Sequence, residues 1–297
     1  MEKNKKPDFI GIGTTRSGST WIYYCLKEHP EICFSSKKET KFFNRAYKYR
    51  KGIDYYNKFF NQCSNHKIKG EFTSDYLLFP KTPDLIHKHF PNIKIIVCLR
   101  NPIEKIFSEY KYHVAVRNQY SIYKTFEELV NKNPSFLKIG FYYNQLKRYF
   151  ELFPRKNILV LFYEDIKKDP IIFLKNIYNF LGLKNKEFIP SKINEKINVS
   201  GTRTAKNRVP LINTLLYRFI AIFTNYHKFK NFTYNYHFNE ILERFLEFNT
   251  IKFVDLNNNK VSNITLNEQM RQFLLKKYLP DIRRLEILLV RKLDFWL

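Results

Sequence analysis

The chain has 297 residues, and because 44% of them are hydrophobic, disorder is excluded over most of its length. No run of about 20 apolar residues occurs, so no transmembrane helix is expected. The charged residues 1–6 are followed by residues 7–13, a segment too short and too strand-like for a signal peptide, and we expect a cytoplasmic protein. The formal net charge of +25 attracts nucleic acid, acidic glycans, anionic lipids or nucleotides, but charge alone does not name the ligand.

Strand and helix patterns alternate over the first two thirds of the chain. Short apolar runs predict buried strands at residues 9–12, 32–34, 68–73, 93–99 and 158–162. Helical patterns cover residues 19–27, 81–90 and 136–153, and further helices are predicted to start at the caps Asn101, Thr125 and Asp169, the last one ending at Gly182. This alternation favours an α/β fold with a parallel, P-loop-like β-sheet flanked by helices.

The remaining third has a different pattern. Residues 183–210 are expected to be loop-rich, and residues 211–297 mainly helical, with apolar positions three and four apart at 211–223, 238–248 and 267–291. No repeat or linker is evident, so residues 1–297 are expected to form a single domain with about 211–265 as a helical insertion or subdomain. The cysteines and histidines lack the spacing of a metal site, and no metal and no disulfide framework are predicted.

A loop bounded by two glycines follows the first predicted strand. Gly13 and Gly18 have the spacing of a phosphate-binding loop, in which backbone N–H groups surround phosphate oxygens at the positive end of a helix. Ser19 stands where nucleotide kinases and hydrolases have a lysine, and Leu99 is followed by Arg100 rather than by a metal-binding acid. These departures weigh against a kinase or hydrolase, and a cationic strand end suits a second anionic group rather than a metal. Arg and Lys side chains could stabilise a transferring group of lower charge than a phosphoryl group, such as a sulfuryl group, without a metal.

Residues 15–21, Thr-Arg-Ser-Gly-Ser-Thr-Trp, resemble the 5′-phosphosulfate loop of sulfotransferases that use 3′-phosphoadenosine 5′-phosphosulfate (PAPS) as co-substrate. The resemblance implies that Arg16 contacts the 5′-phosphate and the bridging oxygen. It also implies that the next residues bind the nucleotide through N–H and hydroxyl groups, namely Ser17, Gly18, Ser19, Thr20 and Trp21.

Further segments resemble the rest of the sulfotransferase nucleotide site. Arg100 at a strand end and Ser108 on the next helix resemble the motif that binds the 3′-phosphate. Tyr163 matches a tyrosine near the adenine, with core packing as the other interpretation, and Ser200 and Arg203 match a late loop that closes over the nucleotide. The segments around Tyr163 and at 278–297 extend the resemblance over most of the chain, except about 211–265.

The acceptor must lose a proton as it attacks sulfur, so a general base is expected. Residues 38–43, Lys-Glu-Thr-Lys-Phe-Phe, resemble the element of heparan sulfate N- and 3-O-sulfotransferases whose glutamate acts as this base, which implies that role for Glu39. Glu71 is the rival candidate. It lies in a segment where heparan sulfate enzymes carry glutamate followed by lysine, and Phe72 here replaces that lysine.

The resemblance therefore implies a PAPS-dependent sulfotransferase, closest to bacterial relatives of the heparan sulfate enzymes, with Glu39 and Arg16 as catalytic residues. The expected acceptor is a hydroxyl or amine of a glycan, for which the positive charge favours an acidic one, and no specific nucleic-acid partner is expected. Two alternatives stay open: a P-loop nucleotide kinase or hydrolase, which would need Mg²⁺, and a non-catalytic polyanion-binding protein, which would account for the charge alone.

Overall fold

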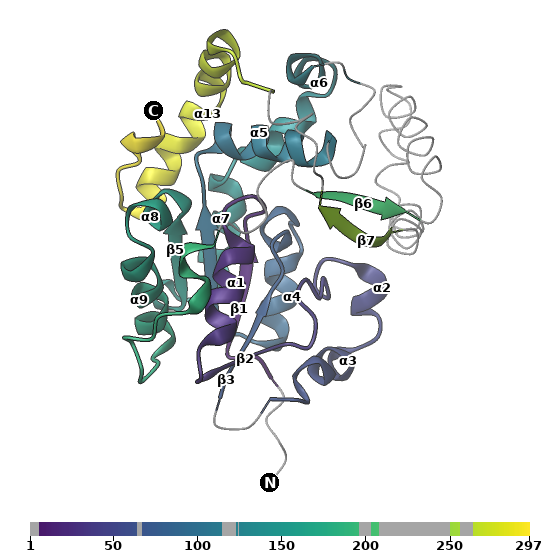
Figure 1. The fold of residues 1–297 in the computed structure, drawn as a ribbon, viewed down its shortest axis with the longest axis vertical. Coiled ribbons are helices and arrows are strands. Elements are labelled where there is room, and N and C mark those ends of the chain that lie inside the picture. Colours follow the sequence, from purple (N-terminus) through teal and green to yellow (C-terminus); the bar gives the residue numbers. More distant parts are fainter. Residues whose placement is uncertain are drawn as a thin grey trace. The chain divides into compact units, whose positions relative to one another are not determined.

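Figure 1 shows a computed structural model of the chain. The structure describes residues 6–63, 67–114, 123, 125–195, 203–207, 250–255 and 264–297, with the backbone alone for 203–207 and 250–255. The chain divides into two compact units, each described by itself below. The first unit contains residues 1–105, 141–197 and 279–297, and the second contains 106–140 and 198–278.

A parallel five-stranded sheet forms the centre of the first unit. Its order is β2-β3-β1-β4-β5, and each neighbouring pair is parallel. The strands coincide with the predicted apolar runs: β1 Phe9–Gly13, β2 Ile32–Phe34, β3 Ile68–Phe72, β4 Lys94–Leu99 and β5 Ile158–Phe162. Because β1 lies between β3 and β4, the loop that follows it is positioned at the middle of the carboxyl edge of the sheet, where parallel sheets bind ligands.

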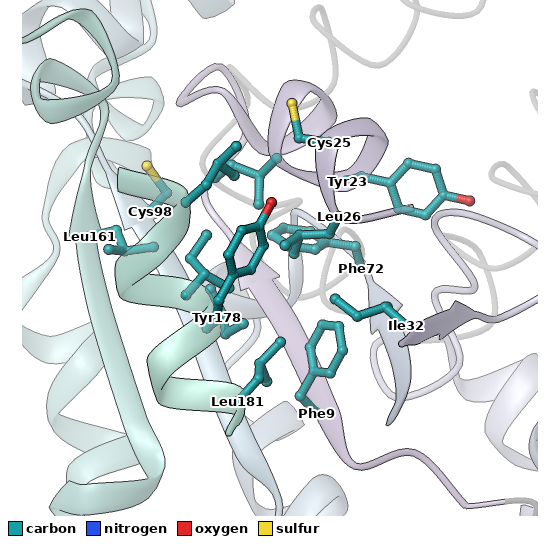
Figure 2. Close-up of a cluster of buried hydrophobic side chains, with 14 of the residues drawn as sticks. Phe9, Tyr23, Cys25, Leu26, Ile32, Phe72, Cys98, Leu161, Tyr178 and Leu181 are labelled. Atoms are coloured by element: carbon teal, nitrogen blue, oxygen red, sulfur yellow. The ribbon is translucent and has the colours of Figure 1, made fainter. Parts of the chain in front are cut away.

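Helices cover this sheet. The helices of the first unit include α1 Ser19–Glu28, α2 Ala46–Tyr49, α3 Ile53–Asn57, α4 Thr82–His89, α7 Tyr143–Leu152, α8 Tyr163–Lys168 and α9 Pro170–Leu181. Figure 2 shows the core between α1, α9 and the sheet, where Leu26, Tyr178 and Phe9 pack together. On β4, Ile96 and Cys98 point into this cluster, so the equally buried Val97 between them points to the opposite face. The sheet is therefore buried on both faces, and the predicted α/β class is confirmed.

The predicted helix caps are also confirmed. The Asn101 side chain accepts a hydrogen bond from the Ile103 N–H (2.9 Å), at the start of α5 (Pro102–Tyr112). Asp169 accepts bonds from the first two N–H groups of α9, and Gly182 ends this helix in the left-handed conformation (φ 78°). Thr125 caps α6 (Phe126–Lys132) by accepting a bond from the Glu128 N–H.

Three predictions of secondary structure are wrong. The single helix expected at 136–153 is divided into a 3₁₀ segment, Pro134–Gly140, and α7. Two segments expected to be loop and helix, Arg203–Asn207 and Thr250–Asp255, form the antiparallel strands β6 and β7 of the second unit. The long C-terminal helix is found as α13, Glu268–Leu289. The helices predicted at 211–223 and 238–248 lie outside the described residues.

The division near residue 140 has a tertiary cause. A Cβ atom at Gly140 would lie 2.7 Å from the Tyr278 hydroxyl, so the backbone is held close to that side chain. At the start of α7, one carboxylate oxygen of Asp281 accepts the N–H groups of Tyr142 (2.8 Å) and Tyr143 (3.2 Å). A distant aspartate thus acts as the N-terminal cap, which helical periodicity within 136–153 does not reveal.

The prediction that the cysteines form no disulfide is also wrong. Cys33 on β2 and Cys63 form a disulfide with their Cα atoms 5.7 Å apart, whereas Cys25 and Cys98 are free and buried. The pair was missed because the two residues are 30 apart in the sequence, and no local spacing indicates that the chain brings them together. Within the described ranges, no helix is long and apolar enough to span a membrane.

Candidate active site

The loop between β1 and α1 has the backbone of an anion-binding turn. Gly13 and Gly18 adopt positive φ values of 146° and 80°, which other residues rarely adopt. Gly18 is the cap residue of α1 and has no side chain to bind the N–H groups of the first helical turn. Those N–H groups lie at the positive end of the helix and suit an anionic ligand.

Two buried hydroxyls fix the interior of this loop. The Thr14 and Ser17 hydroxyl oxygens are 2.5 Å apart. The Thr14 N–H donates to the Cys98 carbonyl oxygen at 2.9 Å, which attaches the loop to the neighbouring strand β4. Ser17 therefore contributes to the shape of the loop from its inside, while Arg16 is half-buried with a positive φ of 60°.

Arg100 brings the second predicted anion-binding element to the same loop. Its Nη1 donates to the carbonyl oxygen of Arg16 at 3.0 Å, and its guanidinium carbon lies 4.8 Å from the centre of the Tyr163 ring. Tyr163 also lines the loop, because a Cβ atom at Gly18 would lie 3.2 Å from its ring. The structure thus brings Arg100 and Tyr163, which are distant in the sequence, to the loop that contains Arg16 and Gly18.

The turn after Arg100 is held by contacts that the sequence analysis missed. The Asn101 N–H donates to the Glu164 carboxylate at 2.9 Å, and the Asn101 side-chain amide donates to the Trp296 carbonyl oxygen at 3.0 Å. The Tyr142 hydroxyl donates to the Arg100 carbonyl oxygen at 2.8 Å. No pattern in the sequence links these distant residues, although Glu164 directly follows the predicted Tyr163.

The other predicted nucleotide residues have different settings. Trp21 is buried in the core, where its indole N–H donates to the Ile193 carbonyl oxygen at 3.2 Å. Ser19 is buried and Thr20 is half-buried in the first turn of α1. Ser108 is a buried residue of the second unit. Ser200 lies outside the described residues, and Arg203 begins β6, for which the backbone alone is described.

Glu39 lies beside the phosphate loop. Its backbone N–H donates to the Phe72 carbonyl oxygen at 3.0 Å, just beyond the end of β3. Its carboxylate accepts bonds from the Ser74 hydroxyl (2.8 Å) and the Ser74 N–H (3.1 Å), and it pairs with Lys38 at 2.8 Å. The backbone oxygen of Ser74 would in turn lie 2.8 Å from a Cβ atom at Gly13. About a quarter of the Glu39 side chain is exposed (26%), so the carboxylate can be reached from outside.

Glu71, the rival base, is fully buried on β3. One of its oxygens accepts hydrogen bonds from the hydroxyls of Thr40 (2.8 Å) and Thr73, and the other from those of Tyr56 (2.7 Å) and Tyr76 (3.4 Å). Burial raises the pKa of Glu71 to about 7, although the four hydrogen bonds act in the opposite direction. A carboxyl group enclosed in this way cannot meet an acceptor, and the geometry favours Glu39.

Phe72 is also buried, and its ring packs against the backbone of β1, where a Cβ atom at Gly11 would lie 2.4 Å from it. The position at which heparan sulfate enzymes carry a lysine therefore belongs to the core here. A contact from this position to a glycan is excluded by its burial.

The chain was compared with known proteins. The sulfotransferase domain family matches residues 6–209. The membrane-associated sulfotransferase kil1 of Dictyostelium discoideum is 40% identical over 111 residues, which cover 36% of this chain and 23% of that protein. Bifunctional heparan sulfate N-deacetylase/N-sulfotransferase 3 of Homo sapiens is 27% identical over 205 residues, which cover 61% of this chain and 23% of that protein. The chain thus matches less than a quarter of the length of either relative.

A solved structure supports the fold over almost the whole chain. The crystal structure of a sulfotransferase from Alicyclobacillus acidocaldarius superposes with a TM-score of 0.66 at 20% identity, covering 98% of each chain. At this identity the likeness shows the fold, and it confirms the expected P-loop-like α/β architecture.

Proposed function

The chain belongs to the sulfotransferase domain family, and we propose that it transfers a sulfuryl group from PAPS to a hydroxyl or amine of a glycan. The observation that supports this most directly is the convergence of Arg16, Arg100 and Tyr163 on the Gly13–Gly18 loop. Two arginines, a helix N-terminus and an aromatic ring fit a nucleotide that carries several anionic groups.

The residues fit this donor in chemistry as well as in position. Arg16 and the N–H groups at the start of α1 would bind the phosphosulfate, and Arg100 the 3′-phosphate. Tyr163 would contact the adenine. Ser108, Ser200 and Arg203 remain predicted nucleotide contacts.

In the proposed reaction, the acceptor oxygen or nitrogen forms a bond to sulfur while the bond from sulfur to the bridging oxygen breaks. The acceptor proton passes to the carboxylate of Glu39, which its exposure and its place beside the loop support. Arg16 and the helix N-terminus stabilise the charge that develops on the leaving phosphate. None of these steps uses a metal ion.

A glycan acceptor is supported by the heparan sulfate enzyme among the relatives and by the net charge of +25, which suits an acidic polymer. The buried Phe72 means that this chain would contact a glycan through other residues than those enzymes use at that position. Whether the product is an O- or an N-sulfate depends on the acceptor group presented to Glu39.

The cytoplasmic location expected from the sequence stays a prediction. The disulfide between Cys33 and Cys63 weighs against it, because thiols are kept reduced in the cytoplasm of most organisms.

Calorimetric binding of adenosine 3′,5′-bisphosphate, the expected product nucleotide, tests the nucleotide site. We expect binding in the presence of a chelator, preference over ATP and 5′-AMP, and at least about tenfold weaker binding in Arg100→Ala, which removes a charged partner of the 3′-phosphate. No preference for the bisphosphate would contradict the proposal. Binding or turnover of ATP that needs Mg²⁺ would favour the kinase or hydrolase alternative instead.

Glu39→Gln tests the proton acceptor. We expect turnover of PAPS to fall by at least about 100-fold, because an amide cannot accept the proton, while the Kd of the bisphosphate stays unchanged. Glu28→Gln is a matched control, since Glu28 is also held by a serine N–H and hydroxyl, those of Ser191, at the opposite end of α1. Full activity in Glu39→Gln would exclude Glu39 as the base.

A further inference from the structure

We propose that Ser74 is a positioning residue, which holds the Glu39 carboxylate at a fixed distance and angle from the phosphate loop. This inference deepens the proposed function and rests on the role of Glu39 as the base. Ser74 was not among the residues that the sequence pattern indicated, although it directly follows the segment containing Glu71.

The first observation is that Ser74 binds both oxygens of the carboxylate. Its hydroxyl donates to Oε1 of Glu39 at 2.8 Å, and its backbone N–H donates to Oε2 at 3.1 Å. Two donors from one residue fix the plane of the carboxylate as well as its place, in the way a bidentate pair does. A single bond to Lys38 would leave the side chain free to rotate.

The second observation distinguishes the two oxygens of Glu39. Oε1 accepts both the Ser74 hydroxyl and the Lys38 ammonium group, each at 2.8 Å. Within the described residues, Oε2 accepts the Ser74 N–H alone. Oε2 therefore keeps more of its capacity to accept a further proton, and we assign it as the oxygen that takes the proton of the acceptor.

The third observation is that Ser74 also touches the start of the phosphate loop. Its carbonyl oxygen would be 2.8 Å from a Cβ atom at Gly13, where φ is 146°. One residue thus contacts the phosphate loop through its carbonyl oxygen and the base through its N–H and hydroxyl. Any change in the position of Ser74 would therefore alter the distance between the Glu39 carboxylate and the phosphate loop.

The backbone of Ser74 is itself anchored on the sheet. The preceding Thr73 donates its N–H to the Gly11 carbonyl oxygen of β1 at 2.9 Å, and its hydroxyl binds the buried Glu71. Glu39 needs such support because its φ of 60° lies in the left-handed region, which costs about 1 kcal/mol for a residue with a Cβ atom. Rigid attachment of the catalytic group from behind is what efficient proton transfer requires.

The test compares three variants with the unchanged protein. In Ser74→Ala, we expect kcat to fall about 10- to 100-fold, as misplacement of a reacting group by about 1 Å does. The KM for PAPS and the Kd of adenosine 3′,5′-bisphosphate should stay unchanged. Ser74→Thr keeps the hydroxyl and should restore kcat to within about threefold, which a role in packing alone does not predict.

Ser191→Ala is the matched control. Ser191 binds Glu28 with the same two donors, its N–H at 2.6 Å and its hydroxyl at 2.9 Å, at the opposite end of α1. We expect this variant to keep full kcat. If Ser191→Ala lowers kcat as much as Ser74→Ala does, the effect is one of general stability and the proposal is wrong.

The outcomes separate this proposal from the proposed function. Loss of turnover in Glu39→Gln together with unchanged kcat in Ser74→Ala would overturn the positioning role and leave Glu39 as the base. Full activity in Glu39→Gln would overturn the base itself. If Ser74→Ala does not fold, as judged by its Tm, Ser74→Cys preserves the volume with a weaker donor. A Ser74→Cys enzyme with unchanged kcat would then overturn the proposal.

Discussion

Glu39 and Glu71 are two carboxyl groups beside the same short segment, residues 73–76, and they have opposite environments. Glu39 is partly exposed, is paired with a lysine and lies next to the phosphate loop. Glu71 is fully buried and accepts hydrogen bonds from four hydroxyl groups. The residue type is the same, so the surroundings alone decide which carboxylate can meet a substrate.

The two glutamates are also connected. Thr40, the residue after Glu39, donates its hydroxyl to Glu71 at 2.8 Å, and Thr73, the residue before Ser74, donates to the same oxygen. Glu71 therefore anchors two segments by hydrogen bonds. One contains Thr40 and carries the proposed base Glu39, and the other contains Thr73 and carries Ser74. The buried carboxyl group stabilises the site, and the exposed one performs the proposed chemistry.

The largest expected difference between the two is in stability. Glu71→Ala leaves four buried hydroxyls without their acceptor and should lower the free energy of unfolding by about 3–5 kcal/mol. Glu39→Ala, at a partly exposed site, should lower it by about 1 kcal/mol or less. Urea unfolding of both variants measures the contrast. Equal losses would show that the two carboxylates are not divided into a structural and a functional one.

A second difference is in the response of stability to pH. Burial raises the pKa of Glu71 to about 7 from its ordinary value of 4.5, so between these pH values the folded protein holds a proton that the unfolded chain releases. The free energy of unfolding should therefore fall as pH rises through this window, by on the order of 3 kcal/mol in total, and then level off.

Unfolding by urea at pH values from about 5 to 8 gives this slope for the unchanged protein and for Glu71→Gln. The amide does not titrate, so the difference between the two curves isolates Glu71. Parallel curves would mean that Glu71 titrates alike in the folded and unfolded chains.

A smaller effect should follow loss of the disulfide, which closes the segment containing Glu39 but not Glu71. The double variant Cys33→Ser, Cys63→Ser should be destabilised by about 2 kcal/mol, near the low end of the usual range, because Thr40 and Tyr56 still anchor the same segment on Glu71. Dithiothreitol should lower the Tm of the unchanged protein and leave that of the double variant constant. The double variant serves as the control for dithiothreitol, because replacing the free cysteine Cys98 would itself disturb the core.

Much of the fold could be predicted because its signals are local. The apolar runs of β1, β4 and β5, the caps Asn101 and Asp169, and the glycine-bounded loop each lie within a few neighbouring residues, and each was found as expected. The resemblance of the loop residues to those of sulfotransferases also indicates a nucleotide site, which stays a prediction.

The rest depends on residues that meet only in the fold. Asp281 caps α7, Trp296 holds the amide of Asn101, and Cys33 joins Cys63, all through contacts between distant parts of the chain. Trp21 belongs to a motif that resembles a nucleotide-binding loop, yet its ring lies in the core, since a motif does not specify which side of a helix faces the ligand. Ser74 has no signal of its own, because its role arises from the partners around it.

The order of the sheet has a consequence for how the protein is made. β1 is synthesised before the other four strands but lies between β3 and β4, so it cannot pair on both sides until about residue 99 has left the ribosome. The turn that presents Arg100 is completed later still, when the Trp296 carbonyl group meets Asn101. Until β4 has been made, at least one edge of β1 is unpaired along the apolar residues Phe9 to Ile12, and such exposed edges aggregate readily. The nucleotide loop is therefore made before the segments that complete it, and we expect a nascent chain to bind chaperones until both strands that flank β1 have been made.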